Sequence, residues 1–379
     1  MRAVTAILLD AYRELSSRKI FWITLLLSLS LVIGYACIGF TETGMSFLFG
    51  LYSIESEYFN LESPLSGVLY RGLFVSFIVA IWLAWAATIL ALISTASIFP
   101  DLVARGSIDM MLSKPVSRFT VFFAKYAAGL LFALLQVTIV CAGVFLAIGW
   151  RLGEWDWMIF LAIPIVVVFF SYLFCISAVA GVVSRSSITA LLVAILFWFM
   201  LFSIQTAESM LLTFKLESQV AMERQEEAAG RTRAAIEAIR ADEGAAENQA
   251  TRLARLNVDL EIEEEAAADQ RRTYEALAPW HRRIELLLAP LPKTGQTIGL
   301  LERWLVREGD LGMQEIMTGN FRRDRDGEIV PNYERETEPM RRLTEHYDSR
   351  SLWSVIGSSL LFQAFILGIG AWIFLRRDF

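Results

Sequence analysis

The sequence predicts an all-α polytopic membrane protein with six transmembrane helices. Apolar residues make up 55% of the 379 residues, and the mean hydropathy of +0.49 is too high for an average soluble domain. Six apolar runs are long enough to cross a bilayer, which takes about 20 helical residues. Charge is segregated, because residues 206–350 hold 21 basic and 29 acidic side chains, net −8, whereas the whole chain carries −6. A membrane part and a large polar insert therefore share the chain.

The first residues, 1–19, are expected to form an amphipathic helix in the membrane interface. Val4, Ile7 and Leu8 share one face, and charged residues occupy the other. The first transmembrane helix follows at residues 20–40. A secretory signal peptide is the competing interpretation, but the run has no convincing small-residue cleavage site. The aromatic and acidic stretch 41–71 predicts a short interfacial helix on the outer face, because amphipathic aromatic residues favour the headgroup level.

The later transmembrane helices are expected at residues 73–99, 122–150, 157–183, 188–204 and 352–375. The chain then divides into an interfacial helix (1–19), five transmembrane helices with a polar loop at 100–118 (20–205), an insert (206–350), and a last transmembrane helix with its tail (351–379). Cys37, Cys141 and Cys175 all fall in apolar segments. They are expected to be small core residues, since none of them can crosslink the insert.

Orientation follows from the basic residues of the short loops. An N-terminus on the cytoplasmic side puts eleven lysines and arginines of the termini and short loops inside, against Arg71 and Arg151 outside. Six spans return the C-terminus to the cytoplasm. Both termini are therefore expected on the cytoplasmic side of a bacterial inner membrane, and the insert on its extracytoplasmic side.

The first half of the insert favours helix. Residues 208–278 are rich in Ala, Glu, Arg and Gln and contain no proline. Leu253, Leu256 and Leu260 follow a three-then-four spacing, so two antiparallel helices with a turn near 241–248 form the preferred picture, a short coiled coil. One solvated helix is the alternative, because the apolar seam is short and diluted by alanine. Pro279, Pro290 and Pro292 are expected to end the helical region.

The loop at 100–118 combines basic residues with an apolar helical pattern. Leu102, Val103, Ile108, Met111 and Leu112 recur at a spacing of three to four residues, and a proline ends the pattern. The loop can therefore form a short helix, exposed to the cytoplasm, on which a soluble partner can act. The candidate docking residues are Asp101, Arg105, Gly106, Ser107, Met111, Leu112, Lys114, Pro115 and Arg118.

These residues, together with Lys125, resemble the first cytoplasmic loop of ABC transporter permeases of the type-two exporter family. The pattern is most similar to the group that includes the nitrous oxide reductase maturation permease. Asp101 stands near the usual Glu, and Ser107 replaces the usual Thr. The turn at 181–187 and the ending at 372–379 also resemble the family, and the insert does not. The resemblance implies that residues 100–118 form the coupling helix that docks on the ATPase subunit.

The chain lacks the Gly-x-x-x-x-Gly-Lys-Ser/Thr pattern, so it is not expected to be an enzyme, and ATP hydrolysis is assigned to a separate subunit. His281 and His346 have no Cys or clustered acid at ligand spacing. They are expected to be solvated surface residues, with no metal or other cofactor. Lys125 is the one ionisable residue inside the predicted spans and is expected to snorkel. Proton-coupled transport and intramembrane proteolysis therefore lose support, and the absence of a dense basic patch argues against nucleic acid.

Two functions remain. The favoured one is the permease subunit of an ATP-driven exporter, paired with a second permease as a homodimer or heterodimer in the lipid bilayer. The alternative is an ATP-energised membrane anchor or mechanotransmitter whose insert acts on an extracytoplasmic protein partner without moving a substrate. A cavity between spans one, two and five of the dimer would favour transport, and a packed interface would favour the anchor.

Overall fold

Six helices are long and apolar enough to cross a membrane, which confirms the six transmembrane helices predicted from hydropathy. The structure is a computed structural model. It describes residues 13, 19–56, 58–61, 63–103, 117–241, 246–305, 321–323, 329–331 and 338–376. Most of the interfacial helix predicted at residues 1–19 lies outside the described residues.

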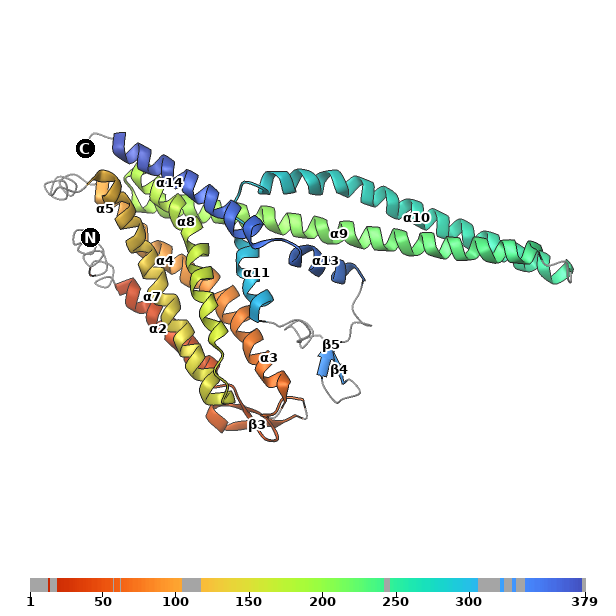
Figure 1. The fold of residues 1–379 in the computed structure, drawn as a ribbon, viewed down its shortest axis with the longest axis horizontal. Coiled ribbons are helices and arrows are strands. Elements are labelled where there is room, and N and C mark those ends of the chain that lie inside the picture. Colours follow the sequence, from red (N-terminus) through yellow and green to blue (C-terminus); the bar gives the residue numbers. More distant parts are fainter. Residues whose placement is uncertain are drawn as a thin grey trace. The chain divides into compact units, whose positions relative to one another are not determined.

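The spans are built from consecutive helical elements (Figure 1). Spans one to three are formed by α2 (Lys19–Ala36), then by α3 (Pro64–Leu73), η2 (Phe74–Ala87), α4 (Thr88–Thr95) and α5 (Ile98–Val103), and then by α7 (Arg118–Leu152). Spans four to six are formed by η3 (Trp157–Leu161) with α8 (Ala162–Ser184), by the first part of α9 (Ser187–Ala241), and by η4 (Trp353–Gly357) with α14 (Ser358–Arg376). η2 and η4 are stretches of π-helix, whose turns are wider than those of an α-helix.

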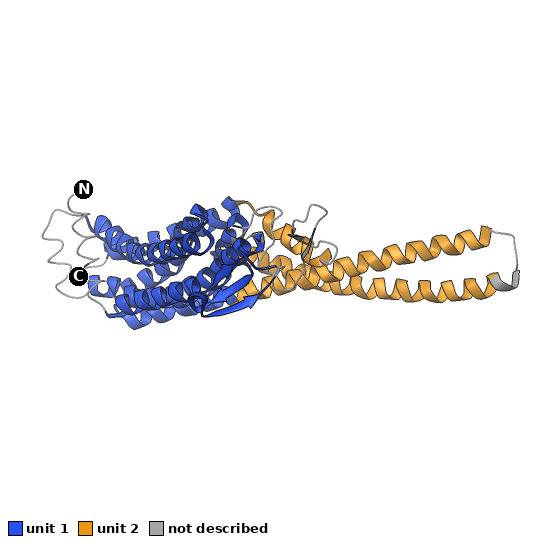
Figure 2. Cartoon of the chain, turned by 90° about the horizontal axis from the view of Figure 1, so that it is seen from below, with its two compact units in different colours: residues 1–202, 291–333, 352–379 blue, residues 203–290, 334–351 orange. Residues whose placement is uncertain are grey.

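The chain divides into two compact units, coloured blue and orange in Figure 2. Unit 1 comprises residues 1–202, 291–333 and 352–379, and unit 2 comprises 203–290 and 334–351. Residues 291–333 of the insert expected at 206–350 belong to the unit that contains the six spans. The boundary between the units falls within α9.

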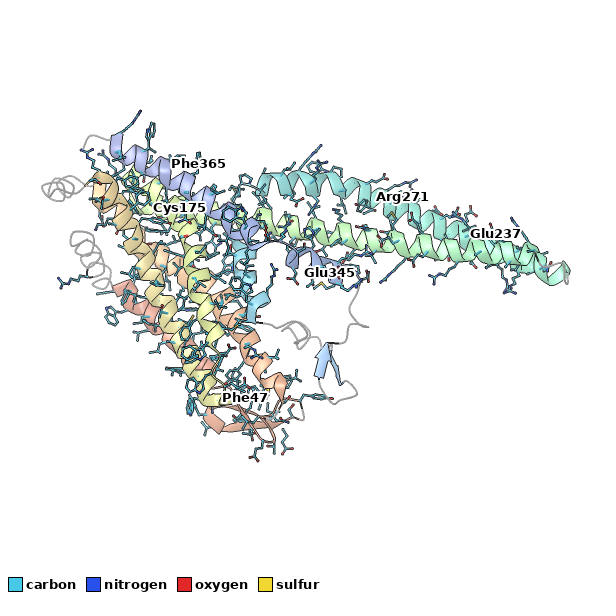
Figure 3. The ribbon with its side chains drawn as sticks, in the orientation of Figure 1. Phe47, Cys175, Glu237, Arg271, Glu345 and Phe365 are labelled. Carbon is cyan, nitrogen blue, oxygen red and sulfur yellow. The ribbon has the colours of Figure 1, made fainter. Side chains whose placement is uncertain are left out.

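α8 is the central helix of unit 1 and packs against α7, α14, α5 and the insert helix α11 (Thr294–Leu305). Its buried aromatic residues fill the space between these helices. Phe174 stacks on Tyr126 of α7 and on Phe170, with ring centroids 5.2 and 5.5 Å apart. A Cβ atom on Gly129 would lie 2.3 Å from the Phe174 ring, so only glycine allows this approach. Cys175 lies among these helices, fully buried (Figure 3).

A small antiparallel sheet stands where residues 41–71 predicted an interfacial helix, so that prediction is wrong for the part before Glu55. Strand β2 (Gly44–Phe47) pairs with β1 (Gly39–Thr41) and β3 (Tyr52–Glu55), with Met45 opposite Phe40 and Ile54. Gly44 and Ser46 fill the buried face of β2. Met45 and Phe47 alternate with Gly44 and Ser46, but the buried face is the one with the small residues, and four residues are too short a run to predict a strand. A second pair, β4 (Phe321–Arg323) and β5 (Ile329–Pro331), is also antiparallel.

α11 is an insert helix that packs on the spans of unit 1. Thr297, Leu300 and Leu301 share its buried face. Lys293 precedes it and is held at both ends. Its backbone N–H donates to Ser359 Oγ at 3.0 Å, and its Nζ donates to the Ser354 carbonyl at 2.6 Å. The stretch 291–305 is therefore a structural part of the membrane unit.

Unit 2 consists of the distal part of α9, the long helix α10 (Ala246–Leu288) and the short helix α13 (Glu338–Asp348). α9 ends at Ala241 and α10 begins at Ala246. Arg233 pairs with Glu264, and Glu226 pairs with Arg271, each at 2.6 Å. The second pair lies seven residues further back on α9 and seven further along α10, so the two helices run antiparallel.

Both long helices of unit 2 carry a heptad pattern of buried and half-buried residues. On α9 these are Glu208, Leu211, Lys215, Ser218, Met222, Gln225, Ala229, Thr232, Ile236 and Ile239. On α10 these are Leu253, Leu256, Leu260, Glu263, Ala267, Gln270, Tyr274, Leu277, His281, Ile284 and Leu288. Spacings of three and four alternate throughout both sets, which is the pattern of a coiled-coil seam. This seam is long but contains many small and polar residues.

Pro279 lies inside α10, which continues to Leu288, so the prediction that this proline ends the helix is wrong. A proline inside a helix removes one backbone hydrogen bond, here to the carbonyl of Glu275. Both residues are exposed. Water can therefore satisfy the free carbonyl, and the helix tolerates the proline at this position.

Candidate functional site

The ends of the predicted docking loop are both fixed within unit 1. On one side α5 ends with Leu102 and Val103 buried and Asp101 exposed. On the other side Ser117 caps α7, accepting the Thr120 N–H on Oγ at 3.1 Å, and Arg118 begins the helix. The candidate residues between these ends lie outside the described residues. They are Arg105, Gly106, Ser107, Met111, Leu112, Lys114 and Pro115.

The α5 side of the loop is anchored on α7 and α8. Phe99 is buried, with its ring centroid 5.0 Å from that of Phe122 and 6.1 Å from that of Phe174. Pro100 lies so close to Gly181 that a Cβ atom there would be 2.9 Å from the proline Cδ. A force applied to α5 is therefore applied directly to the centre of the membrane helices.

A second turn, between α8 and α9, lies at the same end of unit 1, because Gly181 contacts Pro100 and Arg185 donates its N–H to the Gly181 carbonyl at 3.0 Å. Arg185 has φ of 57°, a left-handed conformation that ends α8. Ser184 Oγ accepts the Ser186 N–H at 3.3 Å. The end of α5 and this turn thus lie next to each other, and we call this region, together with the start of α7 and the end of α14, the loop end of unit 1.

A closed polar network joins three spans about two turns into α7. Tyr126 donates to the Ser171 carbonyl at 2.9 Å, the Gln363 amide donates to the Tyr126 hydroxyl at 3.0 Å, and Ser171 Oγ donates to Gln363 Oε1 at 2.8 Å. Every polar group of the Gln363 side chain has a partner, which stabilises contact between α7, α8 and α14 in an apolar surrounding. Sequence reasoning missed these residues, since uncharged polar residues are scattered over all six spans.

Lys125 is buried, with 7% of its surface exposed, so the expectation that it snorkels to the membrane surface is wrong. It lies two turns into α7, next to the tyrosine of the polar network. A lysine here contributes its aliphatic stem to the packing between helices.

The two histidines belong to a charged cluster in unit 2. His281 is only 4% exposed, which corrects the expectation of a solvated surface residue. Its Nε2 lies 3.5 Å from Oε1 of the buried Glu208, and Arg350 lies 3.4 Å from the same oxygen. His346 Nε2 is 3.2 Å from Arg350 NH2, and burial followed by the Arg350 charge lowers the pKa of His346. The heptad spacing from Leu253 onward places His281 in the seam and could have revealed its burial.

Within the described part of the chain, no three side chains of His, Cys, Asp or Glu lie close enough to hold a metal ion. Through Glu208, Glu285 and His281, the cluster connects Arg350, just after the end of α13, to α9 and α10. In unit 1 the described contacts are those that pack the helices together and hold the end of α5 and the start of α7 in place.

The family model for the ABC-2 family transporter protein matches residues 7–287 of the chain. No curated protein and no solved structure matches the chain. The match covers well over half of the sequence and includes five of the six spans together with the loop end. The chain therefore belongs to the ABC-2 transporter family, as a multi-pass membrane component of an ABC transporter.

Proposed function

We propose that this chain is the permease subunit of an ATP-driven exporter, and that a separate ATPase binds it at the coupling helix, residues 100–118. The observation that carries the proposal is the attachment of this segment. Phe99, directly before the segment, and Val103, inside it, are buried, and Ser117, near its end, is the cap of α7. Gly181, four residues before Arg185, contacts Pro100 at the start of the segment. An ATPase that moves this segment moves α5, α7 and α8 together, which is what energy coupling requires.

The residue pattern of the segment supports the finer assignment as well. Arg105, Ser107 and the stretch 111–118 are most similar to the permeases of nitrous oxide reductase maturation, and we place the chain in that group. Exposed apolar side chains on α2, such as Trp22 and Leu26, offer a surface to a second permease subunit. The working transporter is accordingly a dimer of permeases with its ATPase.

The proposed orientation places the loop end and both termini in the cytoplasm and the distal α9–α10 hairpin outside. The distribution of basic residues supports this orientation, because short cytoplasmic loops are enriched in lysine and arginine. Arg118, Arg185 and Arg376 belong to the ends of helices at the loop end. At the other ends of the spans, Arg71 is paired with Asp156 at 3.8 Å, and Arg151 donates to the Ala36 carbonyl while its guanidinium lies over the Phe49 and Trp150 rings.

Site-specific photocrosslinking in the native bacterium tests the proposal. Benzoylphenylalanine in place of Leu112 should crosslink to a polypeptide that contains the Gly-x-x-x-x-Gly-Lys-Ser/Thr pattern, identified by mass spectrometry. The matched probe replaces Leu286, an exposed residue of unit 2, and should give no such product. Arg105→Glu should weaken the Leu112 crosslink, because it reverses a charge on the docking face. A crosslinked partner without the phosphate-binding pattern would refute the coupling assignment.

Cysteine labelling tests the orientation separately. With Cys37, Cys141 and Cys175 replaced, a cysteine at Gly244 should react with an impermeant maleimide in intact cells, and one at Ser113 should react only after the membrane is opened. The reverse pattern would overturn the orientation and leave the family membership untouched.

A further inference from the structure

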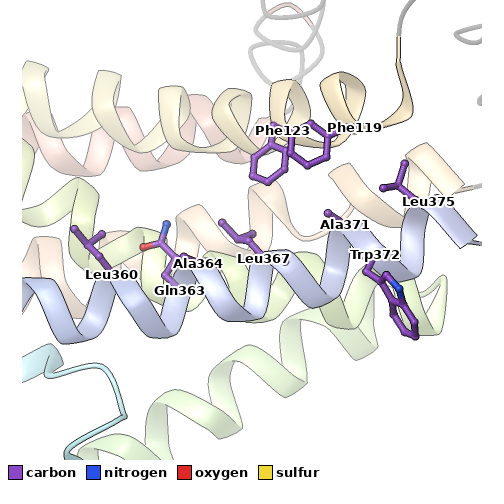
Figure 4. Close-up of a pocket in the computed structure, with 10 residues that line it drawn as sticks. Phe119, Phe123, Leu360, Gln363, Ala364, Leu367, Ala371, Trp372 and Leu375 are labelled. Atoms are coloured by element: carbon purple, nitrogen blue, oxygen red, sulfur yellow. The ribbon is translucent and has the colours of Figure 1, made fainter.

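An open apolar groove lies between α7 and α14 at the loop end of unit 1 (Figure 4). Its volume is about 550 Å³. Phe119 and Phe123 form the α7 wall, their rings 4.6 Å apart, and Leu367, Trp372 and Leu375 contribute from α14. A groove on the outer surface of a membrane helix pair faces the hydrocarbon of the bilayer, so it is filled by acyl chains unless a protein segment covers it.

The groove exists because three small residues of α14 leave space in front of them. Ala364, Gly368 and Ala371 line it, and a Cβ atom added to Gly368 would meet no atom within 4 Å. Elsewhere in α14 the backbone approaches α7 closely. A Cβ on Gly370 would lie 3.2 Å from the Phe122 ring and 2.7 Å from Val179. α14 is thus closely packed at Gly370 and leaves open space in front of Gly368.

Gln363 is the one amide among the groove-lining residues, and it is not available to a ligand. Its amide donates to Tyr126, and its oxygen accepts from Ser171. The inner part of the groove therefore presents mostly apolar surface, which suits a hydrocarbon chain better than a polar substrate.

The outer end of the groove is cationic. Arg376 follows the groove residue Leu375, is exposed, and holds its guanidinium 4.5 Å from the centre of the Trp372 ring. Arg118 directly precedes the groove residue Phe119. α7 begins and α14 ends at this point, so both arginines are at the depth of the headgroups, where tryptophan is also favoured. Guanidinium groups bind phosphate oxygens through paired hydrogen bonds.

We infer that the groove is a binding site for an anionic phospholipid, with one acyl chain against Phe119, Phe123 and Gly368 and the phosphate on Arg376 and Arg118. The charge of the two arginines selects an anionic headgroup over a zwitterionic one. Under the proposed orientation the lipid comes from the cytoplasmic leaflet. The proposed orientation decides only the leaflet, and the lipid site shares Arg118 with the proposed coupling helix, whereas Arg376 lies outside it.

Photoreactive lipids test this inference on the full-length chain in nanodiscs. Phosphatidylglycerol and phosphatidylcholine that carry the same diazirine acyl chain are compared, and labelled peptides are mapped by mass spectrometry. Labelling of residues 118–126 and 360–376 should be at least about fivefold stronger with phosphatidylglycerol, the effect expected for one arginine at a membrane surface. Arg376→Gln should reduce the difference about fivefold, whereas Arg185→Gln at the same end should leave it unchanged.

Gly368→Leu fills the groove and should abolish labelling at Phe119 and Phe123 with either lipid. The matched control is Gly34→Leu, at a glycine of α2 that also faces open space. Equal labelling by the two lipids would refute headgroup selection. Absence of labelling in the unmodified chain would mean that a protein helix covers the groove, and would equally refute the inference.

Discussion

The two units of the chain are held together by different means, although both are made of long helices. In unit 1 the buried surface contains many aromatic rings among aliphatic residues, and a ring can lie directly against a backbone at a glycine, as Phe174 does at Gly129. Lipid offers no hydrophobic drive between helices, so tight packing and polar networks such as Tyr126–Ser171–Gln363 must hold the spans.

In unit 2 the seam is poor in large apolar residues and the charges are many. Ala229 and Ala267 are among its buried residues, and Arg233–Glu264 and Arg271–Glu226 are exposed ion pairs. Exposed pairs of this kind contribute only about 0–1 kcal/mol each. The stability of unit 2 is therefore spread thinly over its few leucines and isoleucines and over the buried pair of Glu208 with Arg350.

The largest expected effect comes from removing seam leucines of unit 2. Leu253→Ala, Leu256→Ala and Leu260→Ala together should cost about 3–5 kcal/mol of the free energy of hairpin opening, because each side chain is half-buried. Hydrogen exchange of the 249–260 amides in the full-length chain should accelerate by two to three orders of magnitude, by about tenfold per 1.4 kcal/mol. The control is Val258→Ala with Ile262→Ala, exposed on the same helix, with a cost below about 0.5 kcal/mol.

The next effect breaks the buried ion pair of unit 2. Arg350→Met should destabilise the base of the hairpin by about 3 kcal/mol, since it leaves the Glu208 carboxylate buried without its cation. Adding Glu208→Gln should restore most of the loss, measured by exchange at α13. Arg272→Met removes an exposed pair with Asp269 and should change stability little. Equal losses for the buried and exposed pairs would remove the distinction drawn between them.

A packing change tests unit 1 in the same way. Gly129→Ala should lower stability by about 1–3 kcal/mol, because its Cβ would lie 2.3 Å from the Phe174 ring in a fully buried layer. Thermal unfolding in detergent, followed by loss of the monodisperse protein, measures the change. Gly34→Ala, where the added atom meets open space, should be neutral or slightly stabilising. Hairpin exchange in unit 2 should not respond to either variant.

The smallest expected effect is a pH dependence confined to unit 2. Burial lowers the pKa of His346 in the folded state, so the unfolded chain, with an ordinary pKa of about 6.5, binds the proton first as pH falls. The stability of α13 should therefore be complete above about pH 6.5 and decrease below it, by less than about 1 kcal/mol because the ring is partly exposed. Arg350, Glu208, Glu285 and His281 face this ring.

Exchange rates at α13, corrected for their intrinsic pH dependence, measure this decrease, and His346→Gln should flatten it. Hydrogen bonding from Arg341 lowers the pKa of Glu338, and that contribution is lost only in stronger acid. If the stability of α13 still decreased near pH 6 in His346→Gln, the pH dependence would belong to another group.

The transmembrane helices could be predicted because their formation depends on the hydropathy of the segment itself. A run such as 122–150 must be helical in a bilayer whatever surrounds it, so hydropathy alone places α7 to within a few residues. The docking loop is likewise predicted from a local pattern and stays a prediction, whereas the described residues on either side of that pattern, Phe99 and Ser117, are packed or capped within unit 1.

Features that depend on distant partners were missed. At Gly44 of β2 a Cβ atom would collide with the Ile54 carbonyl, and this close approach depends on β3, which the four residues of β2 cannot indicate by themselves. Burial of α11 depends on surfaces supplied by α8 and η4. His281 could have been found by extending the heptad count beyond Leu260, because the rule that histidines lie on the surface is weaker than the periodicity of a seam.

The alternating polarity of the two exposed ion pairs has a consequence for how the hairpin finds its alignment during folding. A slip of seven residues in one direction would set Arg233 against Arg271, and a slip in the other would set Glu226 against Glu264. A seam this rich in alanine discriminates poorly between neighbouring alignments, since its layers resemble one another. The repulsion in both slipped states leaves one pairing in which attraction occurs at both positions. Weak pairs can therefore decide the alignment of a helix hairpin whose stability they scarcely change.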